Sequence, residues 1–236
     1  MKRSISSIDG ADPRPLDIIR WPGLTRYAEG LARQEARHQD CVAGRVDDAL
    51  FLLEHSPVFT LGRRAPRHNI LAAPEVLAER GIEVVETGRG GDVTYHGPGQ
   101  VVGYPVIDLR PERKDVRRYV HDLEQVLIDT VAAFGVKAER VDGLVGVWVE
   151  RQRKIGAIGV RISKWVTMHG FALNVTEEVQ SAFRLIVPCG ISDRAVTSLA
   201  QEVGSAPSFD EVVDVVDQCF RAHFGRRPSR GTLFEE

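Results

Sequence analysis

One cysteine stands in a local sequence suited to nucleophilic chemistry. Cys189 lies between Pro188 and Gly190 in the stretch LIVPCGISDRAVTSL, which indicates a turn that leaves the sulfur clear of regular structure. To react, the thiol must become a thiolate, and because a free thiol titrates at about 8.5 it needs a nearby cation. The alternative is an inert buried thiol, as is usual for free cysteines. Cys41 and Cys219 lie in helix-like segments and fit that alternative better.

Lysine is rare in this chain, so each lysine is a candidate for a specific role. Lys154 opens the strand-like run KIGAIGVRI, in which Gly156 and Gly159 provide little side-chain cover. A substrate chain can therefore lie against this strand. The alternative for a lysine at the start of a strand is a solvated charge. We interpret the remaining lysines in that way: Lys2, Lys114, Lys137 and Lys164.

Residues 88–100 read GRGGDVTYHGPGQ, with five glycines and a proline in thirteen positions. Glycine permits positive φ angles and close approach of a ligand to the backbone. Successive N–H groups in such a loop can cradle a carbonyl, carboxylate or phosphate, with Arg89, Tyr95 and His96 as polar tips. Neither the Rossmann pattern GxGxxG nor a P-loop is present. The alternative is a pair of ordinary hairpin turns around a strand at Asp92–Tyr95.

Three histidines stand near turns or glycines. His96 and His169 each precede a glycine, and His55 precedes Ser-Pro. A metal site is disfavoured because no ligand spacing such as HExxH is present, so we expect ordinary hydrogen-bonded histidines. A serine hydrolase is poorly supported because the Gly-x-Ser-x-Gly elbow is missing.

The elements that must position these residues follow from hydrophobic periodicity and capping signals. Strands are predicted at 49–55, 57–62, 82–86, 101–109, 144–150, 155–162 and 166–175, with the turn RQRK joining the fifth to the sixth. Helices are predicted from near Thr25, from Pro74 to Gly81, from an Asp115 N-cap to Gly135, and from a Ser208–Glu211 capping box to Gly225. Strand pairs with interspersed helices indicate an α/β protein with a mixed α+β sheet and flanking helices.

Length and composition set the outer bounds. The 236 residues, 43% apolar, suit one compact domain, and we assign 16–225 to a single catalytic domain between weakly ordered ends at 1–15 and 226–236. A net charge of −2 argues against a dedicated nucleic-acid binder. No apolar run is long enough for a membrane span, and the polar start is no secretory signal. Three cysteines without a CxxC pair fit a reducing cytoplasm.

Four motifs taken together are far more specific than any one of them. GRGGDVTYHGPGQ, KIGAIGVRI, HGFALNV and PCGISDRAVTSL, in this order and at these spacings, closely resemble the lipoyl(octanoyl) transferase family, also called lipoate-protein ligase B. EHSPVFTLGRR and VVGYPVIDL fit the same family, and the match covers roughly residues 20–225. The resemblance implies a biotin/lipoate protein ligase-like catalytic domain.

The resemblance also implies an activity. Members of this family transfer an octanoyl group from octanoyl-acyl carrier protein to a lysine on lipoyl domains of 2-oxoacid dehydrogenases and on the glycine-cleavage H protein. The route implied needs neither ATP nor a metal, and we expect a cytoplasmic monomer that binds neither nucleic acid nor membrane. Both protein partners tend to be acidic, so a basic docking rim is one hypothesis and a solvated charged surface the other. The rim would comprise Arg63, Arg64, Arg67, Arg151, Arg153 and Lys164.

Residue roles carry over from the family by position. Cys189 matches the acyl-thioester nucleophile, and Lys154 matches the lysine that lowers the pKa of that thiol. The acyl chain would then lie over Gly156, Gly159 and Gly170. The implied substrate-binding residues are Arg89, Gly90, Gly91, Asp92, Val93, Thr94, Tyr95, His96, Ala157, Ile158, Gly159, Gly170, Phe171 and Ala172.

Two rival functions remain open at this point. An ATP-dependent lipoate or biotin ligase would use the glycine-rich loop and the lysine for an acyl-adenylate, and Cys189 would be incidental. A non-catalytic adaptor carrying an acyl group or cofactor would use the same pocket and tolerate Cys189→Ser. A reactive thiol at Cys189 would distinguish the transferase from both.

Overall fold

The computed structural model describes residues 14–63, 65–111, 114–187 and 194–228. A large mixed sheet forms the centre of the molecule, with nine strands in the described ranges. Its main path runs in the order β12 (Arg226–Pro228), β1 (Arg14–Thr25), β2 (Asp48–His55), β6 (Gln100–Val106), β10 (Val166–Asn174), β9 (Arg153–Ser163), β8 (Leu144–Val149) and β7 (Ala138–Val141), and β11 (Ala195–Val196) pairs with β9.

A three-stranded sheet stands beside the large one, in the order β4 (Glu83–Glu86), β3 (Val58–Leu61) and β5 (Val93–His96). The pairs β1–β2, β1–β12, β9–β11 and β3–β4 are parallel and the other pairs antiparallel, which confirms the predicted mixed α+β sheet. The helical segments are α1 (Tyr27–Val42), a 3-10 turn at Arg67–Asn69, α2 (Pro74–Glu79), α3 (Val116–Ala133), α4 (Glu178–Phe183), α5 (Leu199–Val203) and α6 (Phe209–Phe224).

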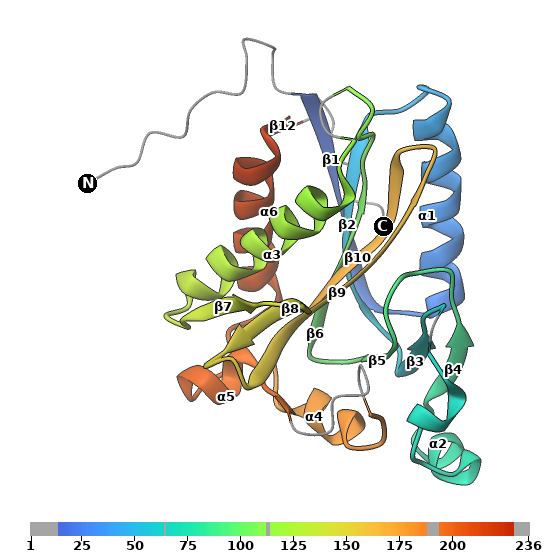
Figure 1. Cartoon of the computed structure of the whole chain (residues 1–236), viewed down its shortest axis with the longest axis vertical. Coiled ribbons are helices and arrows are strands. Elements are labelled where there is room, and N and C mark those ends of the chain that lie inside the picture. The colour runs from blue at the N-terminus through green and yellow to red at the C-terminus, as the bar shows by residue number, and fades with distance from the viewer. Residues whose placement is uncertain (1–13, 64, 112–113, 188–193, 229–236) are drawn as a thin grey trace.

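Helices cover both faces of the large sheet (Figure 1). On one face α3 and α6 bury the larger core, and on the other α1 packs over β6 and β10. Side chains alternate between these faces along β10, since Phe171 and Leu173 belong to the core under α3 and α6 whereas Ala172 belongs to the core on the α1 face. A pocket on the α1 face can therefore be lined only by every second residue of this strand, unless the backbone itself is exposed.

The predicted helix ends are confirmed. Asp115 caps α3, with its carboxylate accepting from the Arg118 backbone N–H at 3.0 Å. Ser208 and Glu211 form the capping box of α6, which ends at Gly225 with a φ of 57°. The first helix begins at Tyr27, close to its predicted start. These signals are local in sequence, so they could be read without tertiary structure.

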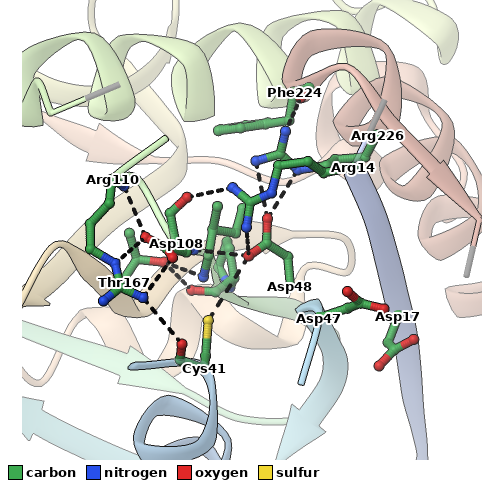
Figure 2. Close-up of polar contacts among 12 residues, drawn as sticks. Arg14, Asp17, Cys41, Asp47, Asp48, Asp108, Arg110, Thr167, Phe224 and Arg226 are labelled. Carbon is green, nitrogen blue, oxygen red and sulfur yellow. Dashed lines mark hydrogen bonds and ion pairs between the residues drawn. The ribbon is translucent and has the colours of Figure 1, made fainter. Parts of the chain in front are cut away.

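The ends of the described chain differ from the prediction. β1 begins at Arg14 and pairs in parallel with β12, although the sequence patterns placed residues 14–15 and 226–228 in weakly ordered ends. The reason is the fully buried carboxylate of Asp48, which binds Arg14 and Arg226 at 3.1 Å each and also accepts the Asp108 backbone N–H (Figure 2). Burying this charge is tolerated because both guanidinium groups neutralise it.

Candidate active site

The candidate site is a pocket of about 280 Å³ on the α1 face of β9 and β10, beside the small sheet. It is lined by thirteen of the sixteen residues that the sequence singled out: Arg89, Gly91, Asp92, Val93, Thr94, His96, Lys154, Ala157, Ile158, Gly159, Gly170, Phe171 and Ala172. Two others, Gly90 and Tyr95, do not line it. The remaining one, Cys189, lies outside the described residues. The structure thus gathers segments about 80 positions apart into one cavity.

The floor of the pocket is made of small residues. Ala157 pairs directly with Ala172, and Gly159 pairs directly with Gly170 on the neighbouring strand. Paired residues share a face of a sheet, so Ala157 stands on the α1 face together with Ala172. Ala157 and Ala172 carry only methyl groups, which leaves a shallow trough in which an extended apolar chain can lie close to the backbone. The two glycines are needed for close packing instead, since a Cβ on Gly159 would stand 3.1 Å from Arg89 Cδ and one on Gly170 2.3 Å from the Gly103 carbonyl oxygen.

Three predicted floor residues point elsewhere. The side chains of Ile158 and Phe171 pack in the core under α3 and α6. Gly156, over which the acyl chain was expected to lie, also faces that side, because a Cβ on it would stand 2.9 Å from Leu127 Cδ1 of α3. That expectation was wrong for Gly156. Strand alternation, interrupted by the irregular pairing between β8 and β9 at Val147 and Trp148, decides which glycines face the pocket.

The glycine-rich segment forms a loop and then β5, so the strand of the hairpin alternative does exist. Arg89 is buried, and its guanidinium donates to the Thr60 carbonyl oxygen at 2.6 Å and to the Thr60 hydroxyl at 2.8 Å. The Gly90 N–H donates to the Val160 carbonyl oxygen at 2.9 Å. A Cβ on Gly159 would approach Arg89 Cδ to 3.1 Å. Glycine at 159 therefore lets the loop lie directly on β9.

Tyr95 does not serve as a polar tip of the cradle. It packs against Phe59 and Phe183, with ring centroids 5.8 and 6.0 Å away, in the core of the small sheet. Asp92, by contrast, stays at the pocket, where its carboxylate accepts from the Val93 N–H at 2.7 Å and from Asn69 Nδ2 at 2.8 Å.

His96 belongs to a directed chain of hydrogen bonds. Asn174 donates to the Thr197 carbonyl oxygen at 2.9 Å, and Gln100 donates to the Asn174 side-chain oxygen at 2.9 Å. The Gln100 oxygen must then accept from His96 Nδ1, 2.8 Å away. This assignment leaves His96 Nε2 without a proton. Burial lowers the pKa of His96 to about 3, so the ring is neutral at physiological pH.

This series of hydrogen bonds ends at β9, the strand that carries Lys154. The Thr197 N–H donates to the Lys154 carbonyl oxygen at 2.9 Å, and Val196 of β11 pairs with Lys154. Lys154 Nζ lies 4.7 Å from the centroid of the buried Trp148 ring. Gly146 leaves room for this side chain, since a Cβ there would stand 3.3 Å from Lys154 Cε. Lys154 is thus held at one end of the pocket.

The described residues on both sides of Cys189 adjoin the pocket. Before it, the Val187 N–H donates to the carbonyl oxygen of Asn69, whose side chain binds Asp92. After it, β11 pairs with the start of β9 at Lys154. The other cysteines are poor nucleophiles, because burial raises the pKa of the Cys41 thiol to about 11 and raises that of Cys219. Cys189 remains the candidate nucleophile.

Sequence patterns missed several residues that line the pocket. Tyr27, Tyr104, Trp148 and Asn174 are among them, and His169 had been assigned only an ordinary hydrogen-bonding role. Two family patterns contained some of them: VVGYPVIDL contains Tyr104, and HGFALNV contains His169 and Asn174. A tyrosine or asparagine within a strand carries no local mark of facing a cavity.

Three of the five rim residues that the structure describes form ion pairs. Arg67 binds Glu86 at 2.8 Å, Arg151 binds Glu139 at 3.3 Å, and Arg153 binds both Glu150 and Glu202 at 2.7 and 3.0 Å. These pairs favour the interpretation of a solvated charged surface for the three arginines. Arg64 lies outside the described residues.

Within the described ranges, no group of three or more His, Cys, Asp or Glu side chains is arranged to hold a metal ion. No helix in the same ranges is both long and apolar enough to cross a membrane.

The fold and site define a class of protein. Residues 26–221 match the family model of the lipoyl protein ligase A/B catalytic domain. The crystal structure of a lipoate-protein ligase A bound with ATP superposes with a TM-score of 0.71, covering 94% of this chain and 90% of that one at 14% identity. This likeness shows the fold and confirms the predicted biotin/lipoate protein ligase-like domain.

Closer relatives define the family more narrowly. The octanoyltransferase of Koribacter versatilis is 53% identical over 181 residues, which are 75% of this chain and 72% of the relative. The octanoyltransferase of Acidobacterium capsulatum is 49% identical over 223 residues, or 87% and 89% of the two chains. The chain therefore belongs to the octanoyltransferase family, as its motifs predicted.

Proposed function

We propose that this octanoyltransferase moves an octanoyl group from octanoyl-acyl carrier protein to a lysine of a lipoyl domain, by way of a thioester on Cys189. The observation that carries the proposal is the placement of Lys154 at one end of a pocket with a small, apolar floor, on the strand that pairs with β11. β11 begins six residues after Cys189 in the chain. Family membership supports the octanoyl group as the cargo.

In the first step the Cys189 thiolate attacks the carbonyl carbon of the octanoyl thioester. A new carbon–sulfur bond forms, the tetrahedral oxyanion collapses, and the phosphopantetheine thiolate leaves and takes up a proton. The ammonium group of Lys154 favours the attacking thiolate by charge attraction. Backbone N–H groups that stabilise such an oxyanion are typically worth about 3 kcal/mol each.

In the second step the amine of the acceptor lysine attacks the acyl-enzyme. A carbon–nitrogen bond forms, the carbon–sulfur bond breaks, and the Cys189 thiolate is restored. Neutral Lys154 takes the proton that the amine loses. Exchange of one thioester for another is nearly balanced and conversion of a thioester to an amide is downhill. The proposed route therefore needs neither ATP nor a metal ion.

The octanoyl chain would lie in the trough over Ala157 and Ala172, beside Gly159 and Gly170. Burial of its six methylenes contributes about 5 kcal/mol at about 0.8 kcal/mol each. The trough has room for the chain because Ala157 and Ala172 carry only methyl groups.

The partners follow from the reaction. We propose octanoyl-acyl carrier protein as the donor, with lipoyl domains of 2-oxoacid dehydrogenases and the glycine-cleavage H protein as acceptors, and a cytoplasmic monomer as the working form. The name of the matching family, lipoyl protein ligase, supports a lipoyl domain as the acceptor.

An ATP-dependent ligase is the second candidate, because the same fold occurs in a lipoate-protein ligase A bound with ATP. That likeness is only 14% in sequence, whereas the octanoyltransferases are about half identical to this chain. The transferase is therefore favoured over the ligase.

Intact-protein mass spectrometry after incubation with octanoyl-acyl carrier protein, without ATP, tests the route. We expect one octanoyl adduct on the wild type and on Cys219→Ser, no adduct on Cys189→Ser, and discharge of the adduct by an added lipoyl domain. If transfer occurred only with ATP and free octanoate, and without an adduct, the thioester route would be wrong.

A further inference from the structure

The two ends of the pocket differ in chemistry. Lys154 and Trp148 stand at one end, near the rung where Gly156 pairs with Leu173. At the other end, Val160 pairs with His169, a rung about 13 Å further along the sheet at about 3.3 Å per residue. Arg89, Tyr104, His169 and Tyr27 line this second end, which we call the far end.

His169 is held in place by its backbone rather than by its ring. Its N–H donates to Gln34 Oε1 of α1 at 2.9 Å, and its φ of 55° lies in the left-handed region. The side chain is only 2% exposed, and its ring nitrogens make no hydrogen bond with any described residue. Two polar nitrogens therefore face the pocket with unused hydrogen-bonding capacity.

Tyr104 also presents an unused acceptor. His55 Nδ1 lies 2.8 Å from the Thr25 carbonyl oxygen, so Nδ1 carries the proton and Nε2 must accept. Tyr104 Oη, 2.7 Å from His55 Nε2, donates its only proton there. The phenolic oxygen can then offer only lone pairs to the pocket. Tyr27 lies beside it and is 2% exposed.

We propose that this polar far end sets the upper limit on acyl chain length, with His169 as its main determinant. The inference deepens the proposed function, since it assumes that the acyl carbonyl lies beside Lys154. A chain that reaches the far end would strip water from polar atoms and offer them no partner. Two extra methylenes improve binding about 15-fold. Each buried polar group left unsatisfied weakens binding by about 5-fold to 150-fold, so several such groups outweigh the gain.

Polarity can be separated from size by a matched pair of variants. His169→Leu and His169→Asn introduce side chains with the same number and branching of heavy atoms, but only asparagine keeps hydrogen-bonding groups at the wall. We expect the preference for decanoyl over octanoyl to rise about 10-fold in His169→Leu relative to His169→Asn. The left-handed backbone at residue 169 could prevent the His169 variants from folding, so a second pair of variants tests the inference at other positions. Tyr104→Phe removes the phenolic oxygen at this wall and should raise the same ratio about 3-fold or more, and Tyr119→Phe, at a buried tyrosine of α3 outside the pocket, should leave it unchanged.

The ratio is measured in two ways on the full chain: as binding of free octanoic and decanoic acids by calorimetry, and as kcat/KM for the two acyl-acyl carrier proteins. Equal ratios in His169→Leu and His169→Asn, or unchanged binding ratios in both His169→Leu and Tyr104→Phe, would overturn the inference. The variants could show the expected binding ratios of decanoic to octanoic acid while the wild type transfers no acyl group to a lipoyl domain. That result would support the far-end inference and contradict only the proposed function.

Discussion

At the scale of single residues, the proposed route gives Lys154 two roles. Lys154 can favour the Cys189 thiolate as a cation and accept a proton as a neutral amine, and these duties require opposite protonation states. The two histidines that line the pocket are not cations at physiological pH, because burial lowers the pKa of His96 to about 3 and that of His169 to about 4. In the proposed route the positive charge is therefore assigned to Lys154 and not to either histidine.

Replacing Lys154 by arginine should separate these duties. Arginine keeps the positive charge but cannot lose its proton in a protein. We expect Lys154→Arg to form the octanoyl adduct but to transfer it to the lipoyl domain at least about 100-fold more slowly, which is the lower range for general base catalysis. Single-turnover mass spectrometry resolves the two steps. Lys164→Arg, at an exposed hairpin turn, is the control, and unimpaired transfer by Lys154→Arg would exclude the proposed proton acceptor.

The buried histidines should also make stability depend on pH. Burial lowers the pKa of His55 and of His169 from 6.5 to about 4. The unfolded chain thus binds protons between pH 6.5 and 4 that the folded chain does not, and their contribution to stability is complete above pH 6.5 and lost as pH falls towards 4. Each histidine contributes up to about 3 kcal/mol.

Urea unfolding between pH 7 and 5 measures this effect above the range in which carboxylates titrate. We expect His55→Gln to reduce the slope of the free energy of unfolding against pH by about 1.4 kcal/mol per pH unit, which corresponds to one proton. The exposed His68→Gln should keep the wild-type slope. An unchanged slope in His55→Gln would mean that this ring is protonated in the folded protein.

At the scale of elements, adjacent strands with small residues make the trough. Ala157 on β9 and Ala172 on β10 meet on the α1 face, while their neighbours Ile158 and Phe171 fill the opposite core. One hairpin thus supplies both a core and a ligand surface, because successive side chains of a strand point to opposite faces.

Filling the trough should block the acyl chain without unfolding the sheet. Ala157→Leu would displace about three methylenes, which lowers kcat/KM for octanoyl transfer about 60-fold at about 0.8 kcal/mol per methylene. The same change at exposed Ala78 of α2 should leave kcat/KM as in the wild type. Normal kcat/KM in a folded Ala157→Leu would show that the acyl chain does not lie on this floor.

At the scale of the whole molecule, one buried charge joins the two ends of the described chain. Asp48 of β2 binds Arg14 of β1 and Arg226 of β12, and Arg14 also donates to the Asp108 carbonyl oxygen at 2.8 Å (Figure 2). The parallel β1–β12 pair comprises only three residue pairs, and this ion cluster adds a buried polar contact between the same segments.

Replacing Asp48 should therefore lower the free energy of unfolding. Asp48→Ala leaves the buried Arg226 guanidinium without its carboxylate, and breaking a buried ion pair in this way typically costs about 3–5 kcal/mol. Asp47→Ala, at the adjacent exposed position, should change the free energy of unfolding by less than about 0.5 kcal/mol. Equal unfolding midpoints for the two variants would contradict this role of the cluster.

The sequence alone determined features that depend on neighbouring residues or on recognisable motifs. The Asp115 cap, the Ser208–Glu211 capping box and the strands of the β9–β10 hairpin depend on residues a few positions apart. The four motifs were enough to identify the family, and thirteen of the residues they implied do line one pocket.

Only the tertiary structure decided which residues meet across the chain. It turned Tyr95 and Gly156 away from the pocket, and it joined His169 to Tyr104 and Tyr27 at the far end. The physical reason is that a residue's face depends on strand register and irregular pairing. Those in turn depend on partners up to about 200 positions away, as for Arg14 and Arg226.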